Sequence, residues 1–311
     1  MHLIKRYIAW LWLITLLLLH SQSSLAAAAL PVDEIAPGIY LHQGLDAFPD
    51  SRNRDEIANI GFVVGDRSVA VIDSGGNPQQ GAALKAAVHQ VTDKPIRYVV
   101  NTHVHPDHIL GNQAFKEAGV VFVGHHKLAE AMAVRAPHYL ATAQRDLGMA
   151  LGADSVVPPT LTVTDKLDLD LGNRTLTLTA HRTAHTNNDL SIYDHKTRTL
   201  WLADLLFVEH VPTLDGSLLG WLAVLEQLAG QPAKLAIPGH GPVQHNWPQA
   251  VLPEKQYLLM LRDEIRALIK EGGSLEQALA QVGQSARGQW KLFDHYHKRN
   301  VSTAFAELEW E

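Results

Sequence analysis

The stretch His103-Val104-His105-Pro106-Asp107-His108 decides how this chain is interpreted, because it places three imidazoles and a carboxylate within six residues. It follows the apolar run 96–100, a pattern typical of a buried strand. Neutral imidazole and carboxylate are ligands that zinc and similar divalent ions prefer. A strand that ends in such a cluster predicts a metal site. The alternative is a chance cluster in a chain with 18 histidines.

Three further side chains that can bind metal follow apolar segments later in the chain. His185 comes after the alternating run 174–179, Asp204 after the run 199–203, and His240 after the run 235–239. In open α/β architectures, ligands gather at the carboxyl ends of strands. The order of these residues therefore predicts that they complete a two-metal site together with the first cluster.

The set HxHxDH, followed by His185, Asp204 and His240, resembles the metallo-β-lactamase fold superfamily over about residues 35–245. The resemblance implies an α+β fold, an αββα sandwich. In such a fold two mixed β-sheets pack face to face, helices cover both outer faces, and the metal site lies at strand ends. It also implies the metal ligands, which are His103, His105 and His185 for the first ion, Asp107, His108 and His240 for the second, and Asp204 as a bridge.

Two departures from the family pattern leave every ligand in place. Ala184 and Ala203 stand where the family often has a glycine before the third histidine and before the bridging aspartate. Both are small, so the backbone can still approach the metals. Asp73 resembles the family's aspartate at the end of an early strand, and we expect it to orient a metal ligand. A turn-starting aspartate before Gly75 explains it equally well.

The first 29 residues are expected to be a secretory signal peptide. Lys5 and Arg6 precede a 12-residue apolar run, and four alanines end the segment at 26–29. Because spanning a bilayer takes about 20 apolar residues, an uncleaved membrane anchor is the less favoured alternative. We therefore expect a periplasmic or secreted protein that has no membrane contact after signal cleavage.

The composition and length of the chain bear on disulfide bonds, on the number of domains and on the class of partner. The chain has no cysteine, so it forms no disulfide even in an oxidising compartment. Residues 30–311 are expected to form a single domain, with its core at about 35–245 and a C-terminal helical part at 250–311. Once Lys5 and Arg6 leave with the signal, 24 basic residues face 32 acidic ones, a net charge of −8. This balance argues against a nucleic-acid partner and is compatible with a small-molecule substrate.

Hydrophobic periodicity predicts strands at 38–42, 60–64 and 120–123, helices at 78–91, 125–152 and 253–270, and a hairpin around Gly172-Asn173. Asp107 is expected to cap a further helix. The resemblance to the superfamily implies that the polar loop 46–59 overhangs the site, with Phe48 and Arg54 in contact with substrate. An ordinary solvated loop is the alternative.

Other side chains near the expected site are assigned from local sequence alone. Asn188, close to His185, is a candidate oxyanion donor, although turn chemistry explains the pair Asn187-Asn188 as well. In the expected helix 125–152, the residues His126, His138 and Tyr139 are candidates for the pocket wall, with surface or packing roles as the alternative.

The segment 205–221, together with the export signal, resembles one branch of the superfamily, the quinoprotein relay system zinc metallohydrolases. The resemblance implies a zinc hydrolase and a periplasmic PQQ-dependent dehydrogenase system as a possible partner. From the residues alone, Asp215-Gly216 is a turn and Ser217 caps a helix that carries Trp221. Asp215 and Trp221 are therefore expected to be structural.

The ligand set predicts a hydrolase with two zinc ions per chain. Two divalent ions about 3.5–4 Å apart can share a water and lower its pKa towards 7. The resulting hydroxide would attack the carbonyl of a small lactam, thioester or ester, and Asp107 is expected to be catalytic by orienting it and taking part in proton transfer. One alternative is a mono-iron sulfur (persulfide) dioxygenase. Another is a non-catalytic accessory protein of a periplasmic PQQ-dehydrogenase system.

Overall fold

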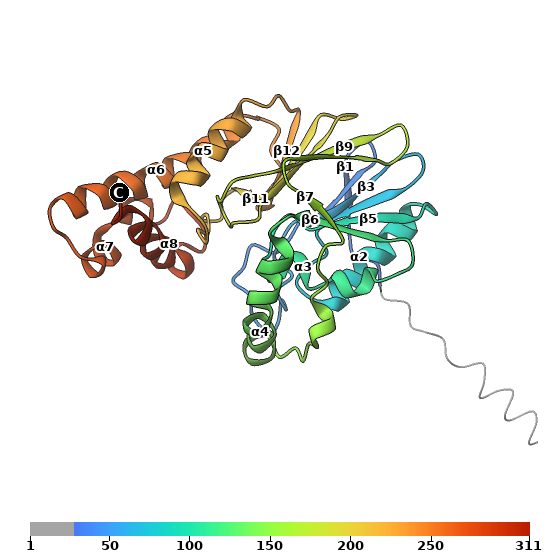
Figure 1. Cartoon of the computed structure of the whole chain (residues 1–311), viewed down its shortest axis with the longest axis horizontal. Helices are drawn as coiled ribbons and strands as arrows, with labels where there is room; N and C mark the ends of the chain where they lie inside the picture. Colours follow the sequence, from blue (N-terminus) through green and yellow to red (C-terminus); the bar gives the residue numbers. More distant parts are fainter. Residues whose placement is uncertain (1–27) are drawn as a thin grey trace, which may run out of the picture.

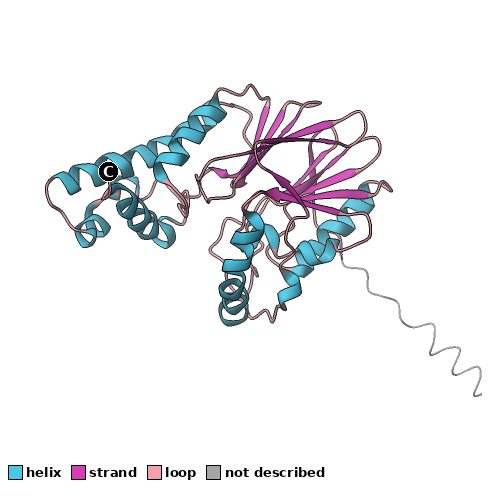
Figure 2. Ribbon diagram, in the orientation of Figure 1, coloured by secondary structure: helices cyan, strands magenta, loops and turns pink. Residues whose placement is uncertain are grey.

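The computed structural model describes residues 28–311, so most of the expected signal peptide lies outside the described residues. Figures 1 and 2 show two β-sheets packed face to face, with helices on both outer faces. The predicted αββα sandwich of two mixed sheets is therefore confirmed. No helix within 28–311 is long and apolar enough to cross a membrane.

The first sheet has seven strands in the order β1-β2-β3-β4-β5-β6-β7. Strands β1 to β4 pair antiparallel, and β4 to β7 pair parallel. Its strands are β1 (Asp33–Ala36), β2 (Ile39–His42), β3 (Ile60–Val64), β4 (Val69–Ile72), β5 (Ile96–Val100), β6 (Val121–His125) and β7 (Leu161–Val163).

The second sheet has five strands in the order β12-β11-β10-β9-β8, and only β11 and β12 pair parallel. Its strands are β8 (Lys166–Asp170), β9 (Thr175–Ala180), β10 (Leu190–Asp194), β11 (Thr199–Phe207) and β12 (Leu235–His240). The predicted hairpin connects β8 and β9, and Gly172 and Asn173 adopt positive φ in its turn.

Successive residues of a strand point to opposite faces of the sheet, so the apolar residues of one strand pack into two different cores. In β4, Ala70 and Ile72 face the core between the two sheets, whereas Val69 and Val71 face the helix α2 (Pro78–Val91). This is the period-two pattern of a strand that is buried on both faces. The side chain of Asn77 accepts from the Gln80 N–H and caps α2, which begins at a proline.

Helices also cover the outer face of the second sheet. The helix α5 (Leu218–Ala229) buries Trp221 completely, and α6 (Leu252–Lys270) packs beside it. The C-terminal helix α8 (Phe293–Leu308) packs on α6, and α7 (Leu275–Gln281) packs on α8, so that the two extend this layer away from the sheets (Figure 1).

The helix α3 (Pro106–Ile109) and the longer α4 (Leu128–Asp146) lie on the side of the first sheet. The bounds predicted for β3 and α2 agree with the structure. The helix predicted at 125–152 is shorter, because His125 still belongs to β6 and the helix ends at Asp146. The predicted N-cap is wrong: His105 is the N-cap residue of α3 and Asp107 lies within its first turn.

Candidate metal centre

The seven predicted metal ligands meet at one edge of the sandwich, although they come from five places in the chain. They are His103 and His105 in the loop after β5, Asp107 and His108 on α3, His185 in the β9–β10 connection, Asp204 in β11, and His240 at the end of β12. Parallel pairing of β4 with β5 and of β11 with β12 brings these strand ends together. The fold thus gathers the residues that sequence order had suggested.

Asp204 does not follow the end of its strand, as the sequence had suggested, because β11 continues to Phe207. The register between β11 and β12 shifts on both sides of Ala203. Ala203 has φ 46°, a left-handed conformation that favours glycine. A β-bulge of this kind can re-aim a side chain, and Asp204, the next residue, lies in the ligand cluster.

The ligand atoms form two groups, each with its members within 4.8 Å of one another. The first group is His103, His105, His185 and Asp204, and the second is Asp107, His108 and His240. Asp204 lies between them. Its Oδ2 is 3.3 Å from His185 Nε2 and 3.5 Å from His240 Nε2, and its Oδ1 is 3.1 Å from His108 Nε2. This is the position that a bridging carboxylate requires.

Each histidine of the cluster uses one ring nitrogen to contact the surrounding protein, so the other nitrogen faces the centre. Such partners fix the orientation and tautomer of metal-binding histidines. The pairs are His103 Nδ1 with Thr102 Oγ1 (3.1 Å), His105 Nε2 with Asp215 Oδ2 (3.0 Å), His108 Nδ1 with Asp73 Oδ2 (2.8 Å), His185 Nδ1 with Thr213 O (2.6 Å) and His240 Nδ1 with Ile57 O (3.1 Å).

The cluster fits a metal because it contains buried polar atoms that the protein leaves unpaired. Within the described residues, His103 Nε2 is buried without a hydrogen-bond partner, and His108 Nε2 and Asp204 Oδ1 are buried 3.1 Å from each other without forming a well-oriented hydrogen bond. Leaving such an atom unsatisfied costs about 1–3 kcal/mol. Divalent ions bound to these donors would remove that cost, and a set of imidazoles and carboxylates suits zinc.

Electrostatics differ between the two groups. Burial lowers the pKa of His185 to about 3 and that of His103 well below its usual value, so both imidazoles are neutral, as ligands must be. In the second group burial opposes a charge, but the carboxylates of Asp204 and Asp107 raise the pKa of His240 to about 10. Metal binding at this group must therefore displace a proton.

Asp73 orients His108 through a network of buried contacts. Its carboxylate accepts from the Thr102 N–H at 2.8 Å, from the Thr102 hydroxyl at 2.7 Å, and from His108. Asp73 has φ 54° and is fully buried. A strained backbone of this kind persists only where the surroundings enforce it. These contacts correspond to the orienting role that the sequence suggested and go beyond those of a simple turn.

Asp215 is a site residue that sequence reasoning assigned to structure. Its carboxylate accepts from His105 at 3.0 Å, from Arg299 on α8 at 2.8 Å, and from Arg135 on α4. Burial opposes the charge of Asp215, yet the hydrogen bond from His105 and the charges of Arg135 and Arg299 hold its pKa far below the usual range. Asp215 therefore supports a predicted ligand. No local pattern could reveal this, because the partner His105 is 110 residues away.

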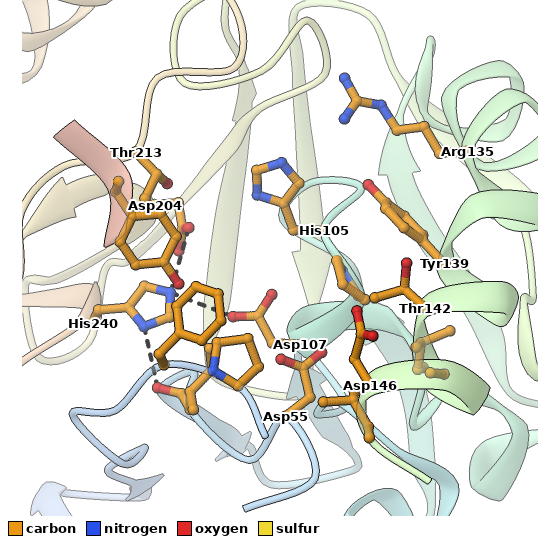
Figure 3. A pocket seen from close by; sticks show the side chains of 18 of the residues that line it. Asp55, His105, Asp107, Arg135, Tyr139, Thr142, Asp146, Asp204, Thr213 and His240 are labelled. Atoms are coloured by element: carbon orange, nitrogen blue, oxygen red, sulfur yellow. Dashed lines mark hydrogen bonds and ion pairs between the residues drawn. The ribbon is translucent and has the colours of Figure 1, made fainter. Parts of the chain in front are cut away.

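A cavity of about 360 Å³ opens onto the cluster. Figure 3 shows Arg135, Tyr139 and Thr142 on one side of it, and Asp204 and His240 on the other. Its lining includes the predicted Phe48, His138 and Tyr139. It also includes residues that the sequence did not suggest, namely Pro49, Asp55, Leu110, Thr142, Asp146, His210, Thr213, Tyr296 and Arg299.

Asp55 stands out among these residues. It is 4% exposed and has φ 66°, so a strained backbone turns a buried carboxyl toward the cavity. Burial and the charge of Asp107 raise its pKa well above the usual value.

Three candidate contact residues lie elsewhere. Arg54 donates to Gln79 at 3.2 Å and does not line the cavity. Asn188 is fully buried, and its amide donates to Asn187. His126 stacks on His125 instead of facing the cavity. The structure therefore does not place Arg54 and Asn188 in the lining of this cavity, and their suggested substrate contacts stay predictions.

Comparisons with known proteins agree with the fold. The family model of the metallo-beta-lactamase superfamily matches residues 53–240. A metallo-beta-lactamase from Pontibacter korlensis is 18% identical, with a TM-score of 0.57 over 73% of this chain and 98% of that one. A stereoselective inverting sec-alkylsulfatase from Pseudomonas sp. is 19% identical, with a TM-score of 0.63 over 83% of this chain and 45% of that one.

Among curated proteins, a linear primary-alkylsulfatase from Pseudomonas sp. is 25% identical over 206 residues. The match covers 55% of this chain and 39% of that relative, so the chain spans about two fifths of the relative's length. Because the family model matches more than half of the sequence, the chain belongs to the metallo-beta-lactamase superfamily. The fold and the histidine and aspartate cluster make it a candidate metalloprotein of that superfamily.

Proposed function

We propose that this protein is a metal-dependent hydrolase that holds two zinc ions and cleaves a small molecule at a carbonyl group, in a lactam, a thioester or an ester. The observation that carries the proposal is Asp204, whose buried carboxylate oxygens lie between the two groups of ligands, 3.1–3.6 Å from histidine nitrogens of both groups. A cavity of small-molecule size adjoins this residue.

Different residues of the chain would have different roles in this hydrolysis. Two bound divalent ions would activate a water molecule and polarise the bond that breaks. Asp107 lines the cavity and ligates the second group. Burial opposes its charge, yet His108 and His240 lower its pKa, so it is a carboxylate that can orient the attacking water and accept its proton. Asp73 and Asp215 would hold His108 and His105 in position.

Hydrolysis of a sulfate ester is a second candidate. Two of the similar proteins are named as alkylsulfatases, and one of them is 25% identical over 206 residues. The same cluster would serve this reaction, but the activated water would attack the sulfur or the carbon of the sulfate ester instead of a carbonyl carbon. A direct comparison of 4-nitrophenyl sulfate, sodium dodecyl sulfate and 4-nitrophenyl acetate as substrates would separate the two.

The first experiment is the metal content of the protein by elemental mass spectrometry, after expression without added metal. We expect about two zinc ions per chain. About one iron per chain would favour the persulfide dioxygenase, and no metal would favour the accessory protein.

His105→Ala and Asp107→Ala are expected to abolish turnover, whereas His89→Ala, on an exposed turn of α2, serves as the matched control.

Export and a partner are further parts of the proposal. The basic start, the apolar run 8–19 and the alanines at 26–29 support a cleaved signal and a periplasmic or secreted location. The segment 205–221 supports a link to a PQQ-dependent dehydrogenase system through its resemblance to the relay-system branch. N-terminal sequencing of the mature protein tests the first point, and co-purification with such a dehydrogenase tests the second.

A further inference from the structure

One face of α4 forms a wall of the cavity. Arg135, Tyr139 and Thr142 are spaced by four and by three residues, so their side chains lie on the same face of the helix. All three line the cavity. Figure 3 shows them side by side, on the side opposite Asp204 and His240, with the Tyr139 hydroxyl pointing toward His105.

The two hydroxyl groups on this face have no acceptor for their protons in the described chain. Tyr139 is 8% exposed, and its hydroxyl, like that of Thr142, is buried without a hydrogen bond. Arg135 lies beside Tyr139, but a guanidinium can only donate, so the phenolic proton still lacks an acceptor. Burial raises the pKa of Tyr139 to about 12, which keeps this proton in place at neutral pH. Both hydroxyls are therefore ready to donate to a ligand.

Two guanidinium groups contact a single carboxylate at the Arg135 end of this face. Arg135 and Arg299 share the single carboxylate of Asp215, and both guanidiniums line the cavity. The acid at the other end of the face, Asp146, accepts two hydrogen bonds from Arg145, at 2.6 and 2.7 Å. An anionic group beside Arg135 would therefore meet a cation that is only partly neutralised.

We propose that Arg135, Tyr139 and Thr142 form a binding subsite for an oxyanion group of the substrate, such as a carboxylate, with Arg299 contributing charge at its rim. The subsite lies across the cavity from the metal ligands, so it would hold one end of a molecule whose reactive bond faces the cluster. The substrate class is then a small hydrolysable compound that carries a separate anionic group. This inference rests on the proposed function only for the identity of the bond that breaks.

Calorimetric titration of the purified protein with benzoate, and with the neutral benzamide, tests the subsite directly. Tyr139→Phe and Thr142→Val are suitable variants, because each removes a hydroxyl that donates no hydrogen bond within the described protein. We expect each to raise the Kd of benzoate about tenfold, as loss of a hydrogen bond to a charged group does. Benzamide should bind weakly and equally to all forms. Tyr193→Phe is the control, since that hydroxyl bonds to Pro232 O away from the cavity.

A pair of esters extends the test to turnover. For mono-4-nitrophenyl succinate, which carries a carboxylate, the double variant Tyr139→Phe/Thr142→Val should raise KM about tenfold or more while kcat changes little. For neutral 4-nitrophenyl acetate, KM should stay the same. Equal benzoate affinity in the double variant and the wild type would overturn the subsite. If neither ester is cleaved but benzoate affinity still depends on the two hydroxyls, the subsite stands and only the proposed reaction is wrong.

Discussion

The imidazole of His105 and the carboxylate of Asp215 are 3.0 Å apart, although 110 residues separate them in the chain. Arg135 on α4 and Arg299 on α8 donate to the same carboxylate. One aspartate therefore connects a predicted metal ligand to two helices on opposite sides of the cavity. The contact leaves His105 Nδ1 facing the cluster, 3.0 Å from His185 Nε2.

Asp215→Asn should weaken metal binding at the first group by about 10–100-fold, because the partner that orients His105 and raises its basicity is lost. Competition with a chromophoric chelator measures this change in the wild type and the variant. Asp46→Asn removes a surface carboxylate that pairs with Lys291 and should leave zinc affinity as it was. Unchanged affinity in Asp215→Asn would show that His105 needs no such support.

Gly239→Ala should disturb the bridging ligand. A Cβ at Gly239 would lie 1.9 Å from Asp204 Oδ1 and 2.8 Å from the Ala203 carbonyl carbon, so the Asp204 carboxylate must move. We expect metal affinity to fall by about tenfold or more, on the scale of other changes that misorient a ligand. Gly230→Ala is the matched control, since its Cβ would meet only Gln227 O at 3.3 Å. A full zinc content with normal affinity in Gly239→Ala would contradict the expectation.

The stability of the fold should decline in mild acid partly because of His181. Burial lowers its pKa in the folded state to about 4, from an ordinary value of 6.5. Between these two pH values the unfolded chain binds more protons than the folded one. The stabilisation is therefore complete above pH 6.5 and is lost as the pH falls toward 4, at up to about 1.4 kcal/mol per pH unit.

His181→Gln tests this slope, because glutamine can still bond to Ser191, which His181 contacts at 2.8 Å, but does not titrate. Urea unfolding measured at several pH values between 4 and 6.5 should give a shallower dependence for the variant. His89→Gln, on the exposed part of α2, should keep the wild-type dependence. Identical slopes in His181→Gln and the wild type would exclude this residue as a source of acid sensitivity.

Arg174 and Asp194 form a buried ion pair whose loss should be costly. Two bonds of 2.9 Å join them, and Arg174 also donates to the carbonyls of Pro37 and Val64. Arg174→Met should lower the free energy of unfolding by about 3–5 kcal/mol, because it leaves a buried carboxylate unpaired. Arg67→Met, which removes an exposed pair with Asp170, should cost no more than about 1 kcal/mol. Chemical denaturation of both variants measures the difference.

The sequence predicted helices and strands well where apolar residues recur with a regular period, and where capping residues and prolines mark the end of an element. Val69 to Ile72 alternate between two cores, and Asn77 with Pro78 marks the start of α2. The metal ligands were predictable because each follows or belongs to an apolar strand, and strand ends of this fold converge. Asp204 lies in the cluster even though its strand continues to Phe207. The register shift at Ala203 interrupts the regular strand directly before Asp204, as the end of a strand would.

The cavity wall was harder to predict because it depends on contacts between distant segments. The role of Asp215 comes from partners on α4 and α8, and the turn sequence Asp215-Gly216 carries no sign of them. Asp55 lines the cavity and its neighbour Arg54 does not, although both have a positive φ, a backbone conformation that a local sequence pattern does not predict. The hydroxyls of Tyr139 and Thr142 matter because they lack partners, which no single-residue pattern reveals.

The loop between β11 and α5 supplies Thr213 and Asp215, which orient His185 and His105, and α8 holds this loop in place. Asn300 accepts from the Leu214 N–H, and Glu307 accepts from Ser217 and Leu218. These residues of α8 lie beyond 53–240, the part of the chain that is shared with the superfamily.

Metal retention should therefore report on the order of the C-terminal helices. Opening of α8 would release the loop that orients two ligands, so zinc binding should slow amide hydrogen exchange in α8, and loosening α8 should speed zinc release. Exchange in α8 that is indifferent to zinc would disprove the link. If the link holds, the far end of the chain acts as a clamp on the ions, and how long the protein keeps its metal depends on helices that never touch it.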